Sequence, residues 1–325
     1  GPPLVMVPGW LSHVERLWSH PSAASALAQL AERHRFIWYD RVGGGLSDRS
    51  RLTESMDDDL GQLEAVLHAA EVDRCRLIGY SAGGPVATRF AVAAPERVEH
   101  LVLYSTYARG ADLSSDEAHD GLVGLIAANW KLASLAMSSV FLPNGSRDDL
   151  AWFTRFQRDA ATPEMAAALL AYVRCHDVSA DLPRVRVPTT VLANRHDPAV
   201  RTELTREVAR LVPGAHLQML EGSEHDPFIR DSGEVVPAIL AAVEGRPFTP
   251  SRPPPTVTVP LTARETEVLT LLGQGASNKD IARQLGVQPS TVERHVTNVY
   301  RKLGANGRAD AAVHAVARGL VSPPR

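Results

Sequence analysis

A serine surrounded by small residues is the strongest chemical signal in the sequence. The stretch GYSAGG at 79–84 follows a short strand pattern at 76–78 and precedes a helical pattern. Small residues at the Gly-x-Ser-x-Gly spacing permit a sharp strand-to-helix turn, which pushes the serine hydroxyl into the open. A hydroxyl exposed in this way becomes a nucleophile when a neighbouring base accepts its proton. Ser81 is therefore the candidate nucleophile.

An acid and a histidine supply candidate partners for this serine. Strand patterns at 189–192 and 215–220 are followed by NRHD at 194–197 and by EGSEH at 221–225. In the chain order Ser, Asp, His, the imidazole of His225 would take the Ser81 proton, while Asp197 would orient that imidazole and stabilise its charged form. The neighbouring His196 and Asp226 leave other pairings open, including a metal site.

The elements that must position these side chains alternate between strand and helix. Their alternation with short links predicts a doubly wound, mostly parallel α/β sheet. A long, mostly helical insertion, from about 107 to 187, would form a cap over Ser81. Helices are expected at 22–33 and 56–70, and strands at 4–7, 35–39, 76–78, 101–104, 189–192 and 215–220.

Several aromatic side chains are candidates for a ligand pocket beneath this cap. Aromatic rings supply much of the apolar lining of small-molecule sites. The alternative is that most of them pack the cap onto the sheet, as large apolar side chains usually do. The pocket candidates are Trp10, from the loop after the first strand, and Trp130, Trp152, Phe153, Phe156 and Tyr172 from the cap.

Residues 1 to about 245 resemble the α/β-hydrolase family, with Ser81, Asp197 and His225 on its three triad positions. The resemblance implies that the backbone N–H groups of Trp10 and Ala82 form the oxyanion hole. It also implies cleavage of an ester or a lactone without a cofactor. Because a fold does not settle function, a receptor that keeps the triad without turnover stays an open alternative.

Two features depart from this family's pattern. Pro8-Gly9 stands where the family has His-Gly after the first central strand, and a side chain that braces the oxyanion hole is thereby missing. Gly1 stands where the family would already have completed two antiparallel strands. Either the sequence is a trimmed fragment, or the sheet is short at that edge. Neither departure removes a member of the triad.

A second functional pattern lies near the end of the chain, in the helix expected at 291–303. Val292, Val296, Val299 and Leu303 recur along one stripe of that helix and would be buried. The opposite side is polar and suits a DNA major groove, where Arg reads guanine and Asn reads adenine. This side collects Ser290, Arg294, Thr297 and Arg301, with Glu293 and Asn298 on its flanks.

Two helices should precede this DNA-reading helix. Capping-box spacings at 262–265 and 277–280 mark their starts, and Gly286 marks the end of the second. Pro289 suits the first turn of the third helix. A tight turn between the second and third helices is typical of a helix-turn-helix.

The segment from LTARETEVL to RADAAVHA resembles the LuxR-type (GerE-like) DNA-binding domain. The resemblance implies four helices, base contacts by Glu293, Arg294 and Thr297, and pairing with a second copy through the fourth helix at 308–318. Gly307 departs from the family's usual Ser, Thr or Asn cap, which weakens the start of that helix. Phosphate contacts, which fix register without reading sequence, are expected from Asn278, Lys279, Arg301 and Lys302.

The two ends of the chain differ in charge. Residues 260–325 carry nine Lys and Arg against five Asp and Glu, a balance of +4, whereas residues 1–259 carry 25 against 32, a balance of −7. A basic tail favours a nucleic-acid partner, and an acidic body repels phosphate. Six prolines within the sixteen residues 245–260 predict an extended, semi-rigid spacer. We therefore expect a hydrolase-like domain at 1–245, a linker at 246–260 and a helix-turn-helix domain at 261–325.

Cysteine usage and hydropathy bear on the compartment. Cys75 and Cys175 are the two cysteines, and neither a CxxC pair nor a zinc-type Cys/His spacing occurs. This usage predicts no disulfide framework, no structural metal and a reducing cytoplasm. The longest apolar run, 122–142, is interrupted by Asn129 and Lys131, and we interpret it as a buried helix rather than a membrane span.

A ligand-pocket fold joined to a DNA-reading domain indicates a transcription regulator. Its expected partners are double-stranded DNA, a small-molecule ligand and a second copy of the chain, because one helix-turn-helix contacts few base pairs. The alternative is an esterase- or lactonase-type serine hydrolase with an accessory C-terminal helical domain.

Overall fold

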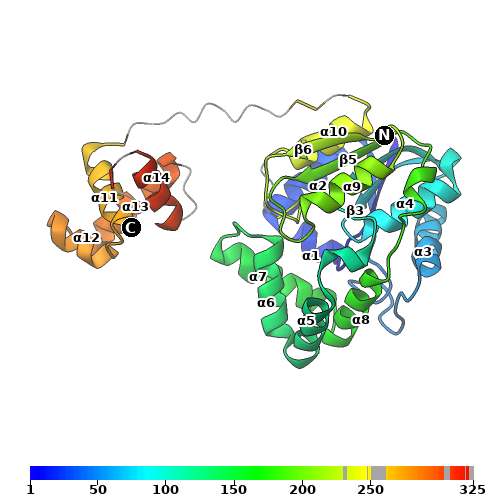
Figure 1. Cartoon of the computed structure of the whole chain (residues 1–325), viewed down its shortest axis with the longest axis horizontal. Helices are drawn as coiled ribbons and strands as arrows, with labels where there is room; N and C mark the ends of the chain where they lie inside the picture. The colour runs from blue at the N-terminus through cyan, green and yellow to red at the C-terminus, as the bar shows by residue number, and fades with distance from the viewer. Residues whose placement is uncertain (230–232, 247, 250–260, 304–307, 319, 322–325) are drawn as a thin grey trace. The chain divides into compact units, whose positions relative to one another are not determined.

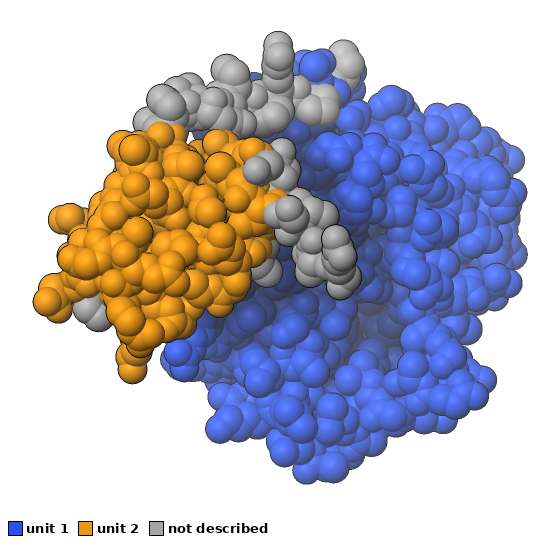
Figure 2. Space-filling model, turned by 60° about the vertical axis from the view of Figure 1, so that its left-hand side comes forward, with its two compact units in different colours: residues 1–250 blue, residues 251–325 orange. Residues whose placement is uncertain are grey.

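The structure, a computed structural model, describes residues 1–229, 233–246, 248–249, 261–303, 308–318 and 320–321. The chain divides into two compact units, residues 1–250 and 251–325, which Figure 2 colours separately. The division falls inside the proline-rich stretch 246–260, most of which lies outside the described residues. In the part of the chain that is described, no helix has the length and apolar character needed to cross a bilayer.

Among the described residues, unit 1 is built on a sheet of six strands in the order β2-β1-β3-β4-β5-β6. Figure 1 labels β3, β5 and β6 of this sheet. Neighbours in this order all pair in parallel, which confirms the expected parallel α/β sheet. Parallel neighbours require crossover connections, which the intervening helices supply. The strands are β1 Pro3–Val7, β2 Arg35–Trp38, β3 Cys75–Tyr80, β4 Val98–Tyr104, β5 Thr189–Asn194 and β6 His216–Leu220.

Both faces of this sheet are buried, because successive side chains point to opposite faces of a strand. In β1, Leu4 and Met6 pack with α2 and α10, whereas Val5 and Val7 pack with α3 and α4 on the other face. A strand covered on both sides has no polar face, and β1 accordingly reads as a continuous apolar run. The covering helices are α1 Val14–Trp18, α2 Pro21–Arg33, α3 Met56–Ala69, α4 Gly83–Ala93, α9 Thr202–Leu211 and α10 Val235–Val243.

The insertion between β4 and β5 forms a helical cap (Figure 1). Ser115, Asn129, Ser146 and Thr162 start its helices, and each accepts a hydrogen bond from the backbone N–H three residues further on. These side chains satisfy N–H groups that lack a partner within the first turn. The cap helices are α5 Asp116–Ala128, α6 Trp130–Phe141, α7 Arg147–Ala160 and α8 Pro163–Arg174.

The apolar run 122–142, predicted as one buried helix, is divided in the structure. Asn129, with φ −156° and ψ 81°, ends α5 and caps α6. The prediction is wrong because the Asn129 side chain bonds the first turn of α6, which favours a new helix start over continuation. Moreover, α6 leaves Leu132, Leu135 and Val140 between 42% and 50% exposed, so it is not a fully buried helix.

A buried ion pair connects the sheet layer to the cap. The Arg41 Nε lies 2.8 Å from Asp59 Oδ1, and solvent reaches at most 4% of either side chain. Asp59 lies on α3, and its other oxygen accepts a hydrogen bond of 2.9 Å from the Tyr172 hydroxyl on α8. The Asp59 carboxylate thus pairs with the buried Arg41 guanidinium and also binds the cap helix α8 through Tyr172.

The described residues of unit 2 form four helices, as the sequence predicts: α11 Ala263–Gly273, α12 Asn278–Leu285, α13 Pro289–Leu303 and α14 Arg308–Ala317. Thr262 and Ser277 form the predicted capping boxes with Glu265 and Asp280. Gly286, with φ +64°, ends α12 in the left-handed conformation that glycine adopts without strain. The expected cap of the fourth helix, Gly307, lies outside the described residues.

The predicted buried stripe of α13 is confirmed. Val292 and Val299 are inaccessible to solvent, and Val296 and Leu303 are at most 8% exposed. They pack in a core to which α11, α12 and α14 contribute. The polar side of α13 is therefore the side that faces away from this core.

Replacing Asp59 with Ala should destabilise unit 1 by about 3–5 kcal/mol, because the Arg41 cation would stay buried without its partner. Tyr172→Phe is the matched control. It removes a hydrogen bond to the same carboxylate and should cost about 1.5–3 kcal/mol. Urea unfolding followed by circular dichroism measures both variants. An Asp59→Ala chain as stable as the control would contradict the importance of the ion pair.

Acid should destabilise unit 1 partly through His176. This imidazole is buried beside the Tyr107 hydroxyl, which lies 3.2 Å from its Nδ1, and burial lowers the pKa of His176 from 6.5 to about 3. The unfolded chain binds the proton near pH 6.5 and the folded chain does not, so stability is lost as the pH falls below that value. His176→Gln should therefore remove about 2 kcal/mol of the difference in unfolding free energy between pH 7 and pH 5. An unchanged difference would show that His176 is protonated without cost in the folded chain.

Candidate functional site

Ser81 lies on the sharp turn between β3 and α4. Its φ is +51°, in the left-handed region that residues with a Cβ rarely adopt. Two hydrogen bonds hold this conformation: Ser81 N donates to Tyr104 O at 3.0 Å, and Thr106 Oγ1 donates to Ser81 O at 2.7 Å. Strain maintained by its surroundings is characteristic of functional turns.

The two glycines of the Gly-x-Ser-x-Gly spacing, Gly79 and Gly83, are required by close approaches of the backbone. A Cβ at Gly79 would lie 2.7 Å from the Cα of Gly84, and a Cβ at Gly83 would lie 2.4 Å from the carbonyl oxygen of Val7. Real Cβ atoms do not approach so closely. The spacing Gly-x-Ser-x-Gly therefore follows from the packing of α4 against β1 and β3.

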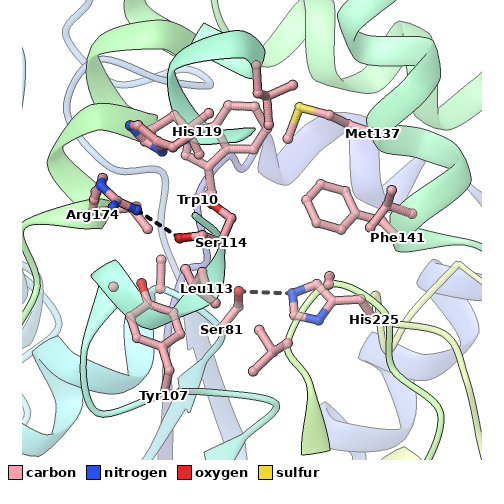
Figure 3. Close-up of a pocket in the computed structure, with 18 of the residues that line it drawn as sticks. Trp10, Ser81, Tyr107, Leu113, Ser114, His119, Met137, Phe141, Arg174 and His225 are labelled. Carbon is pink, nitrogen blue, oxygen red and sulfur yellow. Dashed lines mark hydrogen bonds between the residues drawn. The ribbon is translucent and has the colours of Figure 1, made fainter. Parts of the chain in front are cut away.

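A chain of hydrogen bonds joins Ser81, His225 and Asp197. Ser81 Oγ lies 2.9 Å from His225 Nε2, and His225 Nδ1 lies 2.8 Å from Asp197 Oδ2 (Figure 3 shows the first contact). His225 and Asp197 are 3% and 5% exposed. The other Asp197 oxygen accepts backbone hydrogen bonds from Ala199 and Val200. Since the carboxylate faces Nδ1, the neutral imidazole carries its proton there and leaves Nε2 free to accept from the serine hydroxyl.

The alternative partners in the sequence do not join this chain of hydrogen bonds. Asp226 is buried, and one of its oxygens accepts backbone hydrogen bonds of 2.8 Å from Phe228 and Ile229. Burial raises the pKa of Asp226. His196 is exposed. Within the described ranges, no cluster of three or more His, Cys, Asp or Glu side chains is arranged to hold a metal ion.

Trp10 and Ala82, whose N–H groups the family resemblance assigns to the oxyanion hole, line the same cavity as Ser81. The Arg41 guanidinium donates to the carbonyl oxygen of Gly9 at 3.3 Å. This carbonyl and the Trp10 N–H belong to one planar peptide unit, so Arg41 fixes the direction of that N–H. Arg41 thus supports the Pro8-Gly9 loop, in which the family's histidine is missing. The sequence gives no signal for this role of Arg41, because Arg41 lies in a turn-rich stretch distant from the triad residues.

A cavity of about 240 Å³ opens over Ser81 beneath the cap. Figure 3 shows Met137, Phe141 and His225 on one side of it and His119 and Arg174 on the other. The Arg174 guanidinium donates to the carbonyl oxygen of Ser114 at 3.2 Å and also forms an ion pair with Asp116. Most of the wall is apolar and includes Leu113, Leu122, Met137, Val140, Phe141, Leu170 and Val173.

The aromatic pocket prediction needs correction. Trp10 lines this cavity, whereas Phe153 lines a smaller cavity beside Ser81, and Trp130, Trp152 and Tyr172 line neither of the two. The Trp130 indole donates to Ala161 O at 3.1 Å, which holds it between cap segments. The Tyr172 hydroxyl points to the buried Asp59 carboxylate. Their polar atoms find partners in the protein interior, and this fixes the rings away from the cavity.

The other three cap aromatics of this prediction, Trp152, Phe153 and Phe156, pack against one another. Trp152 stacks on Phe156 with ring centroids 5.3 Å apart and also contacts His20. Phe153 and Phe156 line a smaller cavity next to Ser81. Met137 and Phe141 line the larger cavity without having been predicted to do so, and their spacing of four residues, which places both on one face of α6, is the signal in the sequence.

The polar face of α13 is largely accessible. Ser290, Glu293, Arg294 and Thr297 are exposed, and Asn298 is partly exposed. The Thr297 hydroxyl donates to Glu293 O at 2.9 Å. The side chain of Arg301 lies outside the described residues. The donor-bearing side chain of Arg294 is thus exposed on the face that was predicted to contact bases.

Lys302, one of the predicted phosphate ligands, is engaged elsewhere and this prediction is corrected. Its ammonium lies 2.6 Å from Glu265 Oε2, and the two side chains are 16% and 6% exposed. The partly buried pair ties α13 to α11. Asn278 is also occupied in part, because its Oδ1 accepts a hydrogen bond of 2.7 Å from Arg308. Lys279 is exposed and remains the predicted phosphate contact on α12.

Comparison with known proteins gives two family matches. Residues 2–232 match the family described as alpha/beta hydrolase fold, and residues 259–315 match bacterial regulatory proteins of the luxR family. The second match is supported by a putative HTH-type transcriptional regulator of Mycobacterium bovis. It is 48% identical over 62 residues, which are 19% of this chain and 7% of that protein.

Relatives of the first unit include enzymes. A pimeloyl-[acyl-carrier protein] methyl ester esterase of Nitrosomonas europaea is 29% identical over 240 residues, covering 70% of this chain and 90% of that protein. The crystal structure of a hydrolase from Pseudomonas aeruginosa superposes with a TM-score of 0.65 at 22% identity, covering 75% and 90% of the two chains. The chain therefore belongs to the alpha/beta hydrolase fold family and carries, in addition, a luxR-family DNA-binding domain.

Proposed function

We propose that the protein is a transcription regulator whose hydrolase-fold unit binds a small ester or lactone and whose helix-turn-helix unit binds operator DNA. The observation that carries this proposal is the presence, in one chain, of a Ser81–His225–Asp197 hydrogen-bond chain beside an apolar cavity and of an exposed polar face on α13. A protein of this kind works in the compartment that holds the DNA, which we take to be the cytoplasm.

Hydrolysis at Ser81 is the second part of the proposal. The Ser81 hydroxyl attacks the acyl carbon while His225 Nε2 accepts its proton, and Asp197 stabilises the resulting imidazolium. The N–H groups of Trp10 and Ala82 donate hydrogen bonds to the carbonyl oxygen and stabilise the negative charge that develops on it. His225 then returns the proton to the leaving oxygen, and water releases the acyl group by the same steps. The 2.9 and 2.8 Å contacts within the triad support this reading.

Turnover without DNA binding is the competing function, in which the chain is a serine hydrolase with an accessory helical domain. The name of the Nitrosomonas europaea relative, a methyl ester esterase, favours ester chemistry in the first unit. The luxR-family match and the exposed Arg294 favour the regulator. The two functions are compatible if hydrolysis ends the signal.

Operator recognition requires a dimer in this proposal. One helix-turn-helix covers a half-site, so useful specificity comes from two copies on two half-sites about one helical turn apart. We place the dimer contact on α14, following the luxR-family resemblance. Ligand in the cavity shifts the balance between a dimerisation-competent and an incompetent arrangement, which requires that it bind one of them more tightly.

A fluorophosphonate probe should label the native chain at Ser81, because the triad supplies an activated hydroxyl. Labelling is followed by gel fluorescence and by mass spectrometry of the modified peptide. Ser81→Ala, which removes the hydroxyl and leaves the fold, is the control and should not be labelled. A folded native chain that stays unlabelled would indicate a receptor without turnover.

Replacing Arg294 with Ala should weaken operator binding by about 1–3 kcal/mol and relax the preference at one base pair, because Arg294 lies on the base-reading face. Lys279→Ala is the matched control. It should weaken binding to all sequences alike and reduce the salt slope by about 1. Fluorescence anisotropy with operator and scrambled duplexes, at several salt concentrations, separates these effects. Sequence selectivity that survives Arg294→Ala unchanged would count against the regulator.

A further inference from the structure

A second, smaller cavity borders the same Ser81–His225 pair. Its volume is about 40 Å³, against about 240 Å³ for the cavity under the cap. Trp10, Ser81, Phe141 and His225 line both cavities, and the Trp10 and Phe141 rings lie with centroids 6.5 Å apart. An acyl group attached to Ser81 therefore has access to two compartments of unequal size.

Three side chains that line the smaller cavity carry unpaired polar atoms, and two of them, Trp38 and Gln157, do not line the larger cavity. The indole nitrogens of Trp10 and Trp38 and the Oε1 of Gln157 are buried without a hydrogen-bond partner among the described residues. The orientation of Gln157 is fixed, because its amide nitrogen donates to Ser134 O at 2.9 Å and to Ser138 Oγ at 2.8 Å. Buried polar groups are costly to leave unpaired, so these atoms are suited to pair with a bound group.

Two N–H donors and one carbonyl acceptor match a hydroxyl group, which both accepts and donates. Water and the short alcohol that ester cleavage releases both carry an O–H group of this kind, whereas a longer alkyl group would leave all three atoms unpaired. A cavity of about 40 Å³ has room for a few water molecules or for an alcohol of one or two carbons. The larger cavity, whose wall is mostly apolar, suits a longer hydrocarbon chain.

From this asymmetry we infer that the small cavity takes the alcohol part of the substrate, so that the preferred substrates are methyl or ethyl esters of an apolar acid. The inference rests on the proposed hydrolase function and names its substrate class. Ser81 Oγ bonds to the acyl carbon and its proton passes to His225. The bond between the acyl carbon and the alcohol oxygen breaks, and that oxygen takes the proton from His225 as the alcohol forms beside Trp38 and Gln157. Water then enters this compartment, gives a proton to His225 and bonds to the acyl carbon. The bond between the acyl carbon and Ser81 Oγ breaks, Ser81 Oγ takes the proton back from His225, and the acid leaves.

The test is a series of hexanoate esters with methyl, ethyl, butyl and hexyl alcohols, followed by acid release in a pH-stat. We expect kcat/KM to fall by about tenfold or more between ethyl and butyl. Phe156→Leu, which enlarges the small cavity, should reduce this ratio by about tenfold. Met137→Ala is the matched control, because Met137 lines only the larger of the two cavities. It should change the preference for acid length and leave the alcohol preference intact.

A binding experiment separates failure of this inference from failure of the hydrolase proposal. Ser81→Ala is titrated with methyl and butyl hexanoate while tryptophan fluorescence is recorded. If no ester is hydrolysed by the native chain but methyl hexanoate binds about tenfold more tightly than butyl hexanoate, the hydrolase proposal fails and the small subsite stands. Equal affinities, or equal rates for methyl and butyl esters, would overturn the inference and leave the small cavity as a site for water alone.

Discussion

The hydrogen bonds from Asp197 to His225 to Ser81 are the constraint on which the rest of unit 1 depends. Each residue lies in the loop that follows a strand: Ser81 after β3, Asp197 after β5 and His225 after β6. Contacts of 2.8 and 2.9 Å between these loops form only when the strands between them pair in register. The parallel sheet, whose strand ends meet at one edge, supplies that register, and burial on both faces keeps it rigid.

The cap determines what reaches this constellation, and Arg41 links the two layers. Its guanidinium pairs with Asp59, which also holds the cap helix α8 through Tyr172. The same guanidinium bonds the peptide that carries the Trp10 N–H. The proposed oxyanion hole and the cap therefore depend on the same buried cation. A charge in this environment is stable only while its partners remain in place, so the site and the cap are expected to be ordered together.

The sequence predicted those features that local patterns encode. The strands, the parallel sheet, the capping boxes at Thr262 and Ser277 and the buried stripe of α13 follow from hydrophobic period and turn chemistry, and all are present. Features that depend on distant partners were not predictable. The pairing of Lys302 with Glu265 forms only when α13 packs on α11, so the local sequence does not reveal it and predicts a phosphate contact for Lys302 instead. Trp130 and Tyr172 donate to buried acceptors, Ala161 O and Asp59, that lie far away in sequence. Because the local sequence does not reveal these partners, it predicts both rings to line the pocket.

We propose that occupancy of the hydrolase-fold cavity changes the affinity of the helix-turn-helix unit for DNA. Coupling of this kind typically changes affinity by about 5- to 150-fold. The most direct measurement compares the Kd for an operator, selected from genomic fragments, before and after a fluorophosphonate fills the Ser81 site, with Ser81→Ala treated identically. The account predicts a change of at least about fivefold in the native chain and none in the variant. Identical Kd values for the filled and empty native chain would contradict it.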